Sequence, residues 1–396
     1  MPKVTFYPVG NADTFVIDLA GGEKFIFDYA NRRTGEDGDK RCDLPAELRK
    51  DLGDRTHYDV AVFTHLDLDH YDGMTDFFYL EHDPKFQGKA ADGKKRIKMT
   101  TMWVPAAVLT ENLEDAEEES RVIQKEAWHR LDNGEGIRVF SRPDSLKDAI
   151  EKRGIQFGEV RHLIVDAGRT VPDYTQADHG VEFWVHSPHA SRQNDDDLVD
   201  RNDHAIVLLA AFKVGSVETK VQLFADVTHE VIADIVNVTK KHRNEARLEW
   251  HVFKIAHHSS YLSLGPDKGK TKTNPVDEVV WLFEEQGHTK GIIISTSDPI
   301  PSGDTVQPPH RQAAKYYGDV AAGLEGQFRV TMEHPKKSDP KPLVIDIGAS
   351  GARLVEVTQE ASARSAPNVL TAGMLRPVAP ASPQPAVRKD GGGRYA

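Results

Sequence analysis

The 396-residue sequence predicts a layered α/β fold with β-sheet at its centre. Two observations support this prediction. Short, strongly apolar segments of strand length recur along the chain and are bounded by turns rich in Gly, Asn and Asp. Segments with helical periodicity lie between them. With 39% hydrophobic residues, the chain is long enough to bury a sizeable core in one large domain or two ordinary ones.

The first segments read as strands. "KVTFYPV", "TFVIDLA" and "KFIFDYA" are separated by "GNAD" and by a Gly-Gly turn. "DVAVFT" is a nearly continuous apolar run, which is typical of a strand covered on both faces. Met74, Phe77 and Phe78 then fall at i, i+3 and i+4 and predict the start of a helix.

The middle of the chain is more charged. Helical periodicity between 110 and 152 suggests an insertion of about residues 85–160 that lies over one edge. Further helices are expected at 228–242 and 275–286. Five more segments predict strands: "VEFWVHSP", "AIVLLAAF", "KVQLFADV", "WHVFKIAHHSS" and "GIIISTS". We therefore expect one domain over residues 1–357, followed by a Pro/Ala-rich, disordered tail at 358–396.

Composition limits the classes of protein to consider. No apolar run approaches the roughly 18 residues of a membrane span, and no signal-peptide pattern precedes the first strand, so we expect a cytoplasmic protein without membrane association. Cys42 is the only cysteine, which excludes an internal disulfide and a thiolate metal cluster. The net charge of −12 argues against non-specific coating of nucleic acid. It leaves a nuclease possible, because bound divalent cations supply local positive charge.

Metal-capable residues gather at the ends of predicted strands, where rigid sheets usually carry active-site groups. The segment "HLDLDH" places His65, Asp67, Asp69 and His70 in six positions. Asp226 follows the strand "VQLF", and a His257–His258 pair follows "FKIA". Carboxylates with imidazoles suit zinc, manganese or iron, and two such ions close together can share a bridging carboxylate. As a lone strand-end acid, Asp226 is the natural bridge.

Other interpretations compete at single positions. Asp69 or Asp72 alone would be explained as a helix N-cap, but four metal-capable residues in six positions favour a metal site. Asn202 and His204 begin a strand and are candidates to contact metal or substrate, and His310 precedes a predicted helix and is a similar candidate. Basic groups between 85 and 98 are interpreted as a solvated loop.

The motifs resemble the metallo-β-lactamase-fold hydrolases, whose signature is His-x-His-x-Asp-His after a strand. The Asp at position 67 makes the chain most similar to the branch of the ComEC competence (DNA-uptake) protein, which carries His-x-Asp-x-Asp-His. "FYPVGNADTFVID" is similar to that branch's opening "DVGQGDA", and "FIFDYA" to its "IDtG". "KIAHHSS" stands where the branch has "KVPHHGS", with Ser259 in place of Gly, and "LFADV" stands where it has "LTGD".

The resemblance implies a four-layer αββα sandwich with a dinuclear site at one edge. It implies that His65 and Asp67 bind one metal, that Asp69 and His70 bind the other, and that Asp226 bridges them. One member of the pair at 257 and 258 completes a metal shell and the other contacts or protonates the leaving group. The resulting prediction is a metal set of His65, Asp67, Asp69, His70, Asp226 and His257, a catalytic set of Asp69, His257 and His258, and a substrate-binding set of Asn202, His204, Ser259 and His310.

The predicted function is a dinuclear-metal hydrolase, and specifically a phosphodiesterase or nuclease that uses a metal-bridged hydroxide on a nucleic acid or nucleotide. Two divalent ions, Zn²⁺ or Mn²⁺, are the expected cofactors, and Asp67 favours the harder manganese. A small ester, lactone or thioester as substrate is the alternative. A further alternative is an effector subunit of a bacterial defence or conjugation system, whose 85–160 insertion or C-terminal tail contacts a protein partner.

Overall fold

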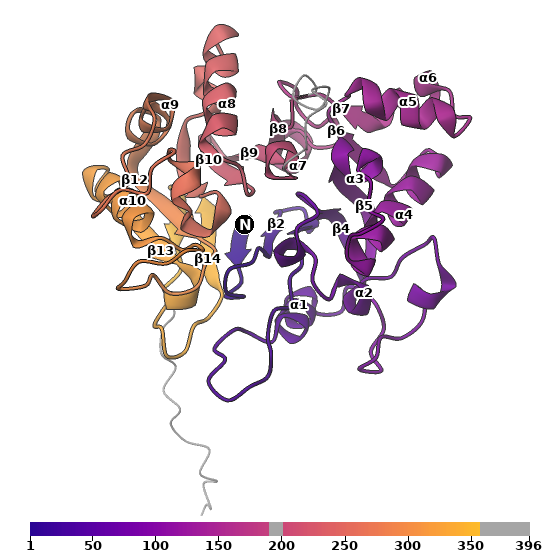
Figure 1. Cartoon of the computed structure of the whole chain (residues 1–396), viewed down its shortest axis with the longest axis horizontal. Coiled ribbons are helices and arrows are strands. Elements are labelled where there is room, and N and C mark those ends of the chain that lie inside the picture. The colour runs from indigo at the N-terminus through magenta and orange to yellow at the C-terminus, as the bar shows by residue number, and fades with distance from the viewer. Residues whose placement is uncertain (190–200, 357–396) are drawn as a thin grey trace, which may run out of the picture. The chain divides into compact units, whose positions relative to one another are not determined.

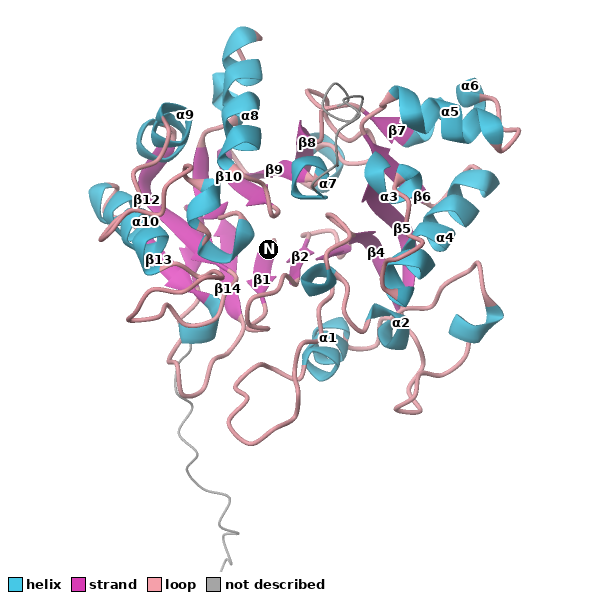
Figure 2. Cartoon of the chain, viewed as in Figure 1, coloured by secondary structure: helices cyan, strands magenta, loops and turns pink. Residues whose placement is uncertain are grey.

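The computed structural model describes residues 1–189 and 201–356. Within these residues two β-sheets face each other, and helices cover the outer face of each sheet (Figures 1 and 2). The order of layers is therefore helix, sheet, sheet, helix. This arrangement confirms the predicted αββα sandwich.

The first sheet has nine strands in the order β15-β14-β1-β2-β3-β4-β5-β6-β7. Pairing is parallel from β3 to β7 and antiparallel from β15 to β3. Its strands are β1 (Lys3–Phe6), β2 (Phe15–Asp18), β3 (Lys24–Phe27), β4 (His57–Val62), β5 (Lys98–Pro105), β6 (Ile137–Phe140), β7 (Ile164–Val165), β14 (Leu343–Gly348) and β15 (Gly351–Leu354).

The second sheet has six strands in the order β13-β12-β11-β10-β9-β8. The strands from β10 to β13 are parallel, and β8 and β9 are antiparallel additions at one edge. Its strands are β8 (Val181–Ser187), β9 (Val207–Val214), β10 (Val217–Phe224), β11 (Trp250–Lys254), β12 (Gly287–Ser295) and β13 (Gln327–Val330). Large apolar side chains such as Phe25, Trp103 and Phe183 fill the space between the two sheets.

Helices on the first sheet bury one apolar face against it, and Leu48 of α1, Ile123 of α4 and Met102 of β5 belong to the same core cluster. These helices are α1 (Leu44–Leu52), α2 (Met74–Phe77), α3 (Ala106–Thr110), α4 (Glu118–Asn133), α5 (Asp144–Lys152) and α6 (Phe157–Val160). The second sheet is covered by α8 (His229–Lys241), α9 (Asp277–Val280) and α10 (Arg311–Gly323), and the short α7 (Gln176–His179) precedes β8. None of the helices in the described residues is long and apolar enough to cross a membrane.

Most of the predicted elements are present, and the largest difference lies between residues 85 and 160. The strands expected before residue 65 and between 181 and 295 are observed, as is the helix at 228–242. Residues 85–160 were expected to form a helical insertion, but β5 and β6 lie within them as inner strands of the first sheet. Their side chains are buried there because the sheet continues past β4, so Trp103 belongs to the inter-sheet core. The expected tail at 358–396 lies outside the described residues.

The topology brings four strand ends to one place. β10, β11 and β12 are parallel neighbours, so the segments that follow them leave the sheet at the same edge. Asp226, the pair at 257 and 258, and Thr296 lie in these segments. The motif at 65–70 follows β4 of the facing sheet. Both sheets therefore contribute to a single candidate site.

Candidate metal centre

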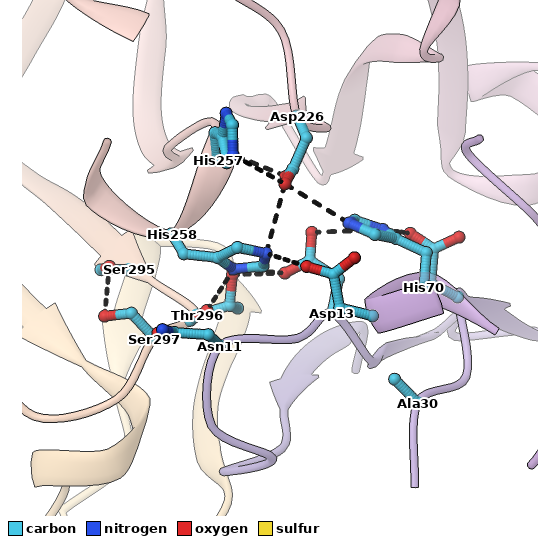
Figure 3. Close-up of polar contacts among 12 residues, drawn as sticks. Asn11, Asp13, Ala30, His70, Asp226, His257, His258, Ser295, Thr296 and Ser297 are labelled. Carbon is cyan, nitrogen blue, oxygen red and sulfur yellow. Dashed lines mark hydrogen bonds and ion pairs between the residues drawn. The ribbon is translucent and has the colours of Figure 1, made fainter. Parts of the chain in front are cut away.

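Four side chains converge at this edge of the sandwich. Asp69, His70, Asp226 and His258 each offer one nitrogen or oxygen atom, and these four atoms all lie within 4.8 Å of one another. His70 and Asp69 come from the segment after β4, and the other two come from the segments after β10 and β11. Figure 3 shows Asp226 pointing between His70 on one side and the histidine pair on the other.

Hydrogen bonds at the far side of the ring orient His258. The side chain is 1% exposed, and its Nδ1 lies 2.7 Å from the carbonyl oxygen of Thr296. Because a carbonyl only accepts, Nδ1 is the donor of this bond. Nε2 is thereby directed to the cluster, 3.1 Å from Oδ2 of Asp69 and 3.2 Å from Oδ2 of Asp226.

His70 is oriented in the same manner. The ring is fully buried, and its Nδ1 lies 2.8 Å from Oδ2 of Asp28. Asp28 is itself fixed, because it accepts hydrogen bonds from the backbone N–H and the hydroxyl of Thr64, both at 2.7 Å. Nε2 of His70 has no hydrogen-bond partner among the described residues and lies 3.5 Å from Oδ2 of Asp226. Such outer hydrogen bonds to a carboxylate are typical of histidines that bind metals.

A second pair lies beside this cluster. The rings of His65 and His70 are 3.9 Å apart between centroids, and Nε2 of His65 lies 3.5 Å from Oδ2 of Asp67. That Nε2 atom is also buried without a hydrogen-bond partner among the described residues. Arg201 holds this segment, since its Nη1 donates to the carbonyl oxygen of Leu66 at 2.7 Å and lies 3.3 Å from Oδ1 of Asp67.

The turn that carries the histidine pair has an unusual backbone. His257, His258 and Ser259 have φ values of 48°, 52° and 66°, which is the left-handed region. Each such residue costs roughly 1–2 kcal/mol relative to glycine, and strain of this kind clusters at functional sites. Asp226 supports the turn by accepting a hydrogen bond from the backbone N–H of His257 at 3.1 Å. As a result His258 points inward, while the side chain of His257 stays 23% exposed with Nε2 3.9 Å from Asp226.

The imidazoles and carboxylates of the cluster stabilise one another's charged forms. Burial alone would lower the pKa of His258, but Asp226 and Asp69 outweigh it and raise that pKa to about 10. Burial opposes the charge of His70 too, yet Asp28 and Asp226 raise its pKa well above the usual range. Conversely, burial would raise the pKa of Asp226, and the two neighbouring imidazoles hold it well below its ordinary value. Asp69 and Asp226 are therefore ionised although they are largely buried, and their negative charge requires a nearby positive charge to balance it.

These observations fit divalent metal ions. The Nε2 atoms of His65 and His70 are buried without a hydrogen-bond partner among the described residues, and the ionised carboxylates of Asp69 and Asp226 lie close to His70. Nitrogen and oxygen donors of this kind suit zinc, manganese or iron. A second group, formed by Asp13, Asp28 and His70, is also close together. It fits a metal less well, because Asp28 is bound by Thr64 and Asp13 is bound by Lys254.

The predicted substrate residues surround the cluster to different degrees. Asn202 and His204 lie in a single 3₁₀ turn, and the backbone N–H of Ile206 bonds to the carbonyl oxygen of Thr64 at 3.0 Å, which places this segment beside the motif. Ser259 is fully buried under the histidine turn. Both ring nitrogens of His310 contact the backbone: Nδ1 accepts from the N–H of Tyr261 at 3.3 Å, and Nε2 donates to the carbonyl of Val306 at 3.2 Å.

Several supporting residues are not apparent from the motif. Asp13 forms a buried ion pair with Lys254 and accepts a hydrogen bond from the hydroxyl of Thr296, so it ties the opening turn to the second sheet. Asp28 and Arg201 have the orienting contacts described above. Asp13 and Asp28 stand within segments that resemble the family's opening motifs, which is the only signal the sequence offers for them. Arg201 has no such signal.

Comparison with protein-family models and with curated protein sequences gives no match. Solved structures that match the chain include a diphosphatase of the PhnP family, with 10% identity and a TM-score of 0.35 over 87% of this chain and 98% of the other. Unliganded yeast PDE1 has 10% identity and a TM-score of 0.39 over 83% and 97%. A long-form RNase Z from yeast has 10% identity and a TM-score of 0.29 over 89% and 49%. We therefore assign function from the arrangement of the site residues.

Proposed function

We propose that this chain is a divalent-metal-dependent phosphodiesterase of the metallo-β-lactamase type, in the branch that resembles ComEC, acting on a nucleic acid or nucleotide. The observation that carries the proposal is the convergence of Asp69, His70, Asp226 and His258, with a second metal-capable pair beside them. Two of the histidines have Nδ1 held by an outer partner and Nε2 directed to the centre. A metal site requires histidines oriented in this way, whereas a turn held by hydrogen bonds does not require it.

The chain's own residues suggest how two ions would be shared. Asp69, His70 and His258 would hold one ion, His65 and Asp67 the other, and Asp226 lies where its Oδ2 faces both histidines of the cluster. His258 replaces His257 in the set of ligands, because His258 and not its neighbour belongs to the four converging residues. Bound divalent cations, Zn²⁺ or Mn²⁺, would activate water and offset the charge that builds on a phosphoryl group.

His257 is placed for a different task. It lies at the rim of the cluster with its side chain 23% exposed, so it can meet a substrate that does not enter the buried core. Burial lowers the pKa of His257, and the ring is therefore neutral at pH 7 with one N–H to donate. We assign it the contact with the leaving oxygen of the substrate.

Substrate assays with matched variants test the proposal. Purified protein supplied with Mn²⁺ or Zn²⁺ is offered bis-p-nitrophenyl phosphate, single- and double-stranded DNA, and RNA, alongside a p-nitrophenyl ester, a lactone, a thioester and a β-lactam. We expect the largest kcat/KM for a phosphodiester, loss of activity with chelator, and a loss of at least about 10²-fold in Asp69→Asn and Asp226→Asn. Asp76→Asn, an exposed acid on α2, serves as the matched control. Activity that survives Asp226→Asn, or that is largest on an ester, would contradict the proposal.

A further inference from the structure

A strongly basic cavity lies at the opposite edge of the first sheet from the metal centre. Its volume is about 680 Å³, and it is lined by the end of α1, the segment 53–56 just before β4, the start of β5 and residues from the segment 79–97. The metal-binding motif follows the carboxyl end of β4, whereas this cavity borders the amino end of the same strand. Six residues at about 3.3 Å each put roughly 20 Å of strand between the two places. The cavity is thus a separate site.

Positive charge is concentrated in this cavity, although the chain as a whole has a net charge of −12. One acidic side chain, Asp54, is found among its lining residues. Against it stand six basic ones, which are Arg49, Arg55, Lys89, Lys95, Arg96 and Lys98. Two separate stretches of the chain supply these groups, residues 49–55 and 89–98, so the fold adds the two arginines to the basic segment that follows residue 88.

The backbone forces two of these charges together. Lys89 and Lys95 are directly opposite each other in a small antiparallel bridge, closed by a hydrogen bond from Ala90 N–H to the carbonyl oxygen of Lys94 at 2.8 Å. Like charges in opposed positions repel and destabilise a hairpin. Arg49 adds to this arrangement, since its Nη1 donates to the carbonyl oxygen of Lys95 at 2.8 Å. Neither lysine forms an ion pair with another described residue, so no acidic group in that part of the chain offsets the repulsion.

Arg96 has buried N–H donors that lack a hydrogen-bond acceptor among the described residues. Its side chain is 8% exposed and packs on the ring of Phe86, yet its buried Nε and Nη1 have no hydrogen-bond partner among the described residues. The carboxylate of Asp76 is 3.8 Å from Nη2, beyond hydrogen-bond distance. The Nε atoms of Arg49 and Arg55 are also buried without partners among the described residues, while Nη2 of Arg55 pairs with Asp59 at 2.6 Å. Leaving a charged donor buried and unpaired costs free energy that an anion bound beside it would recover.

We propose that this cavity binds a compact ligand that carries at least two phosphate groups, such as a nucleoside triphosphate or an inorganic polyphosphate. A volume of about 680 Å³ is within the range of small-molecule sites, which is roughly 300–1,000 Å³. A guanidinium that is rigid and buried is well suited to phosphate oxygens. The lining also holds one aromatic ring, that of Tyr79, with the ammonium of Lys98 over it at 5.0 Å from the centroid. This proposal does not depend on the proposed function, because it uses none of the metal-site residues.

A long nucleic-acid strand suits the surroundings less well. A phosphodiester backbone follows a continuous basic strip. Beyond the cavity lie the exposed carboxylates of Asp43, just before α1, and Asp76 on α2, and the half-buried carboxylate of Glu47 on α1. Acidic side chains therefore interrupt the positive charge around the cavity, which favours a compact ligand.

Calorimetric titration with tripolyphosphate and with ATP, in the presence of chelator so that the metal centre takes no part, tests the proposal. We expect saturable binding that weakens as salt is added. Arg96→Gln should weaken probe binding by about tenfold. Lys95→Gln, which changes an exposed side chain, should independently weaken probe binding several-fold. Lys50→Gln removes the same charge from an exposed position on α1 outside the lining, and Asp226→Asn removes a metal-site acid; both should retain the wild-type affinity.

Equal affinity for the two probes would show that phosphates alone are recognised, and tighter binding of ATP would show that the base is held too; both results support the site. Circular dichroism shows whether the Arg96→Gln protein folds. If that variant does not fold, the test rests on Lys95→Gln, which changes an exposed side chain. Three outcomes would overturn the proposal: no binding at millimolar probe, binding unchanged in both Arg96→Gln and Lys95→Gln, or tighter, Arg96-dependent binding of a single-stranded oligonucleotide.

Discussion

Nε2 of His258 lies 3.2 Å from Oδ2 of Asp226, across two neighbouring parallel strands of the second sheet. The same imidazole gives its Nδ1–H to the carbonyl of Thr296 after the next strand. Three consecutive strand ends are thereby joined through one ring. This relationship distinguishes the two adjacent histidines and leads to the first prediction.

His258→Asn should lose bound metal, and His257→Asn should keep it. The first ring lies inside the four-residue cluster, whereas the second lies at its rim. We expect His257→Asn to retain the wild-type metal content but to lose about 10²-fold or more in kcat, because the hydrogen bond from the imidazole N–H to the leaving oxygen is lost. Metal analysis of both dialysed variants, with kinetics on a phosphodiester, makes the comparison. The reverse pattern, with metal lost only in His257→Asn, would exchange the two roles.

Asp28→Asn should weaken metal binding although Asp28 would not touch a metal. Its carboxylate orients the ring of His70 through a 2.8 Å contact with Nδ1. Loss of an outer partner of this kind typically costs about 10–100-fold in metal affinity. Competition with a fluorescent chelator measures the change. Asp43→Asn, which changes an exposed acid, is the control. If Asp28→Asn and Asp43→Asn bind metal with equal affinity, Asp28 does not position His70 for metal binding.

The metal-free protein should lose stability as pH rises above neutrality. The folded-state pKa of His258 is raised to about 10 from an ordinary 6.5, because the nearby carboxylates outweigh the effect of burial. The stabilisation that its charge provides is therefore fully present below about pH 6.5 and lost as pH rises towards 10. Urea denaturation in chelator at several pH values measures this loss.

Metal binding should replace the proton on this ring. Metal-loaded protein should then lack the stability loss, and metal addition near pH 7 should release protons. Titration calorimetry in buffers of different ionisation enthalpy counts them. Metal-free protein whose stability is flat between pH 6.5 and 10, or metal uptake without proton release, would show that the imidazole is neutral before metal binds.

Ser259→Gly should stabilise the protein. Ser259 has a φ of 66°, and its buried hydroxyl has no hydrogen-bond partner among the described residues. Glycine removes the left-handed strain and the unpaired hydroxyl, and part of that gain is offset by greater freedom of the unfolded chain. We expect a net increase of about 1 kcal/mol in the free energy of unfolding. Ser263→Gly in the same loop should destabilise instead, because that hydroxyl donates to the carbonyl of Val227 at 2.9 Å. Equal effects of the two changes would count against strain at 259.

The sequence predicted the strand ends well because apolar runs and strand-end acids are local signals. "DVAVFT" predicted β4, and the motif after it marked the edge of the sheet where the candidate site lies. β5 and β6 were missed because they lie within a charged stretch of the chain whose burial depends on the neighbouring strand. The helix expected at 275–286 is an α-helix only at Asp277–Val280 and continues as a wider turn.

The orienting contacts of the site could not be predicted because they join residues far apart in the chain. Arg201 reaches Asp67 from 134 positions away, and Lys254 reaches Asp13 from 241. The roles of the adjacent histidines differ only through backbone torsions that sequence does not reveal. The basic cavity shows the same limit: four of its basic residues lie between 89 and 98, but Arg49 and Arg55 join them only in the fold.

The most direct test of the central claim is the metal content of the protein after saturation with Mn²⁺ or Zn²⁺ and dialysis. The proposed site should retain about two ions per chain, since it offers two sets of donors around Asp226. Asp226→Asn should retain one or none, and Asp76→Asn should retain the wild-type number. Fewer than one ion per chain in the wild-type protein would contradict the account.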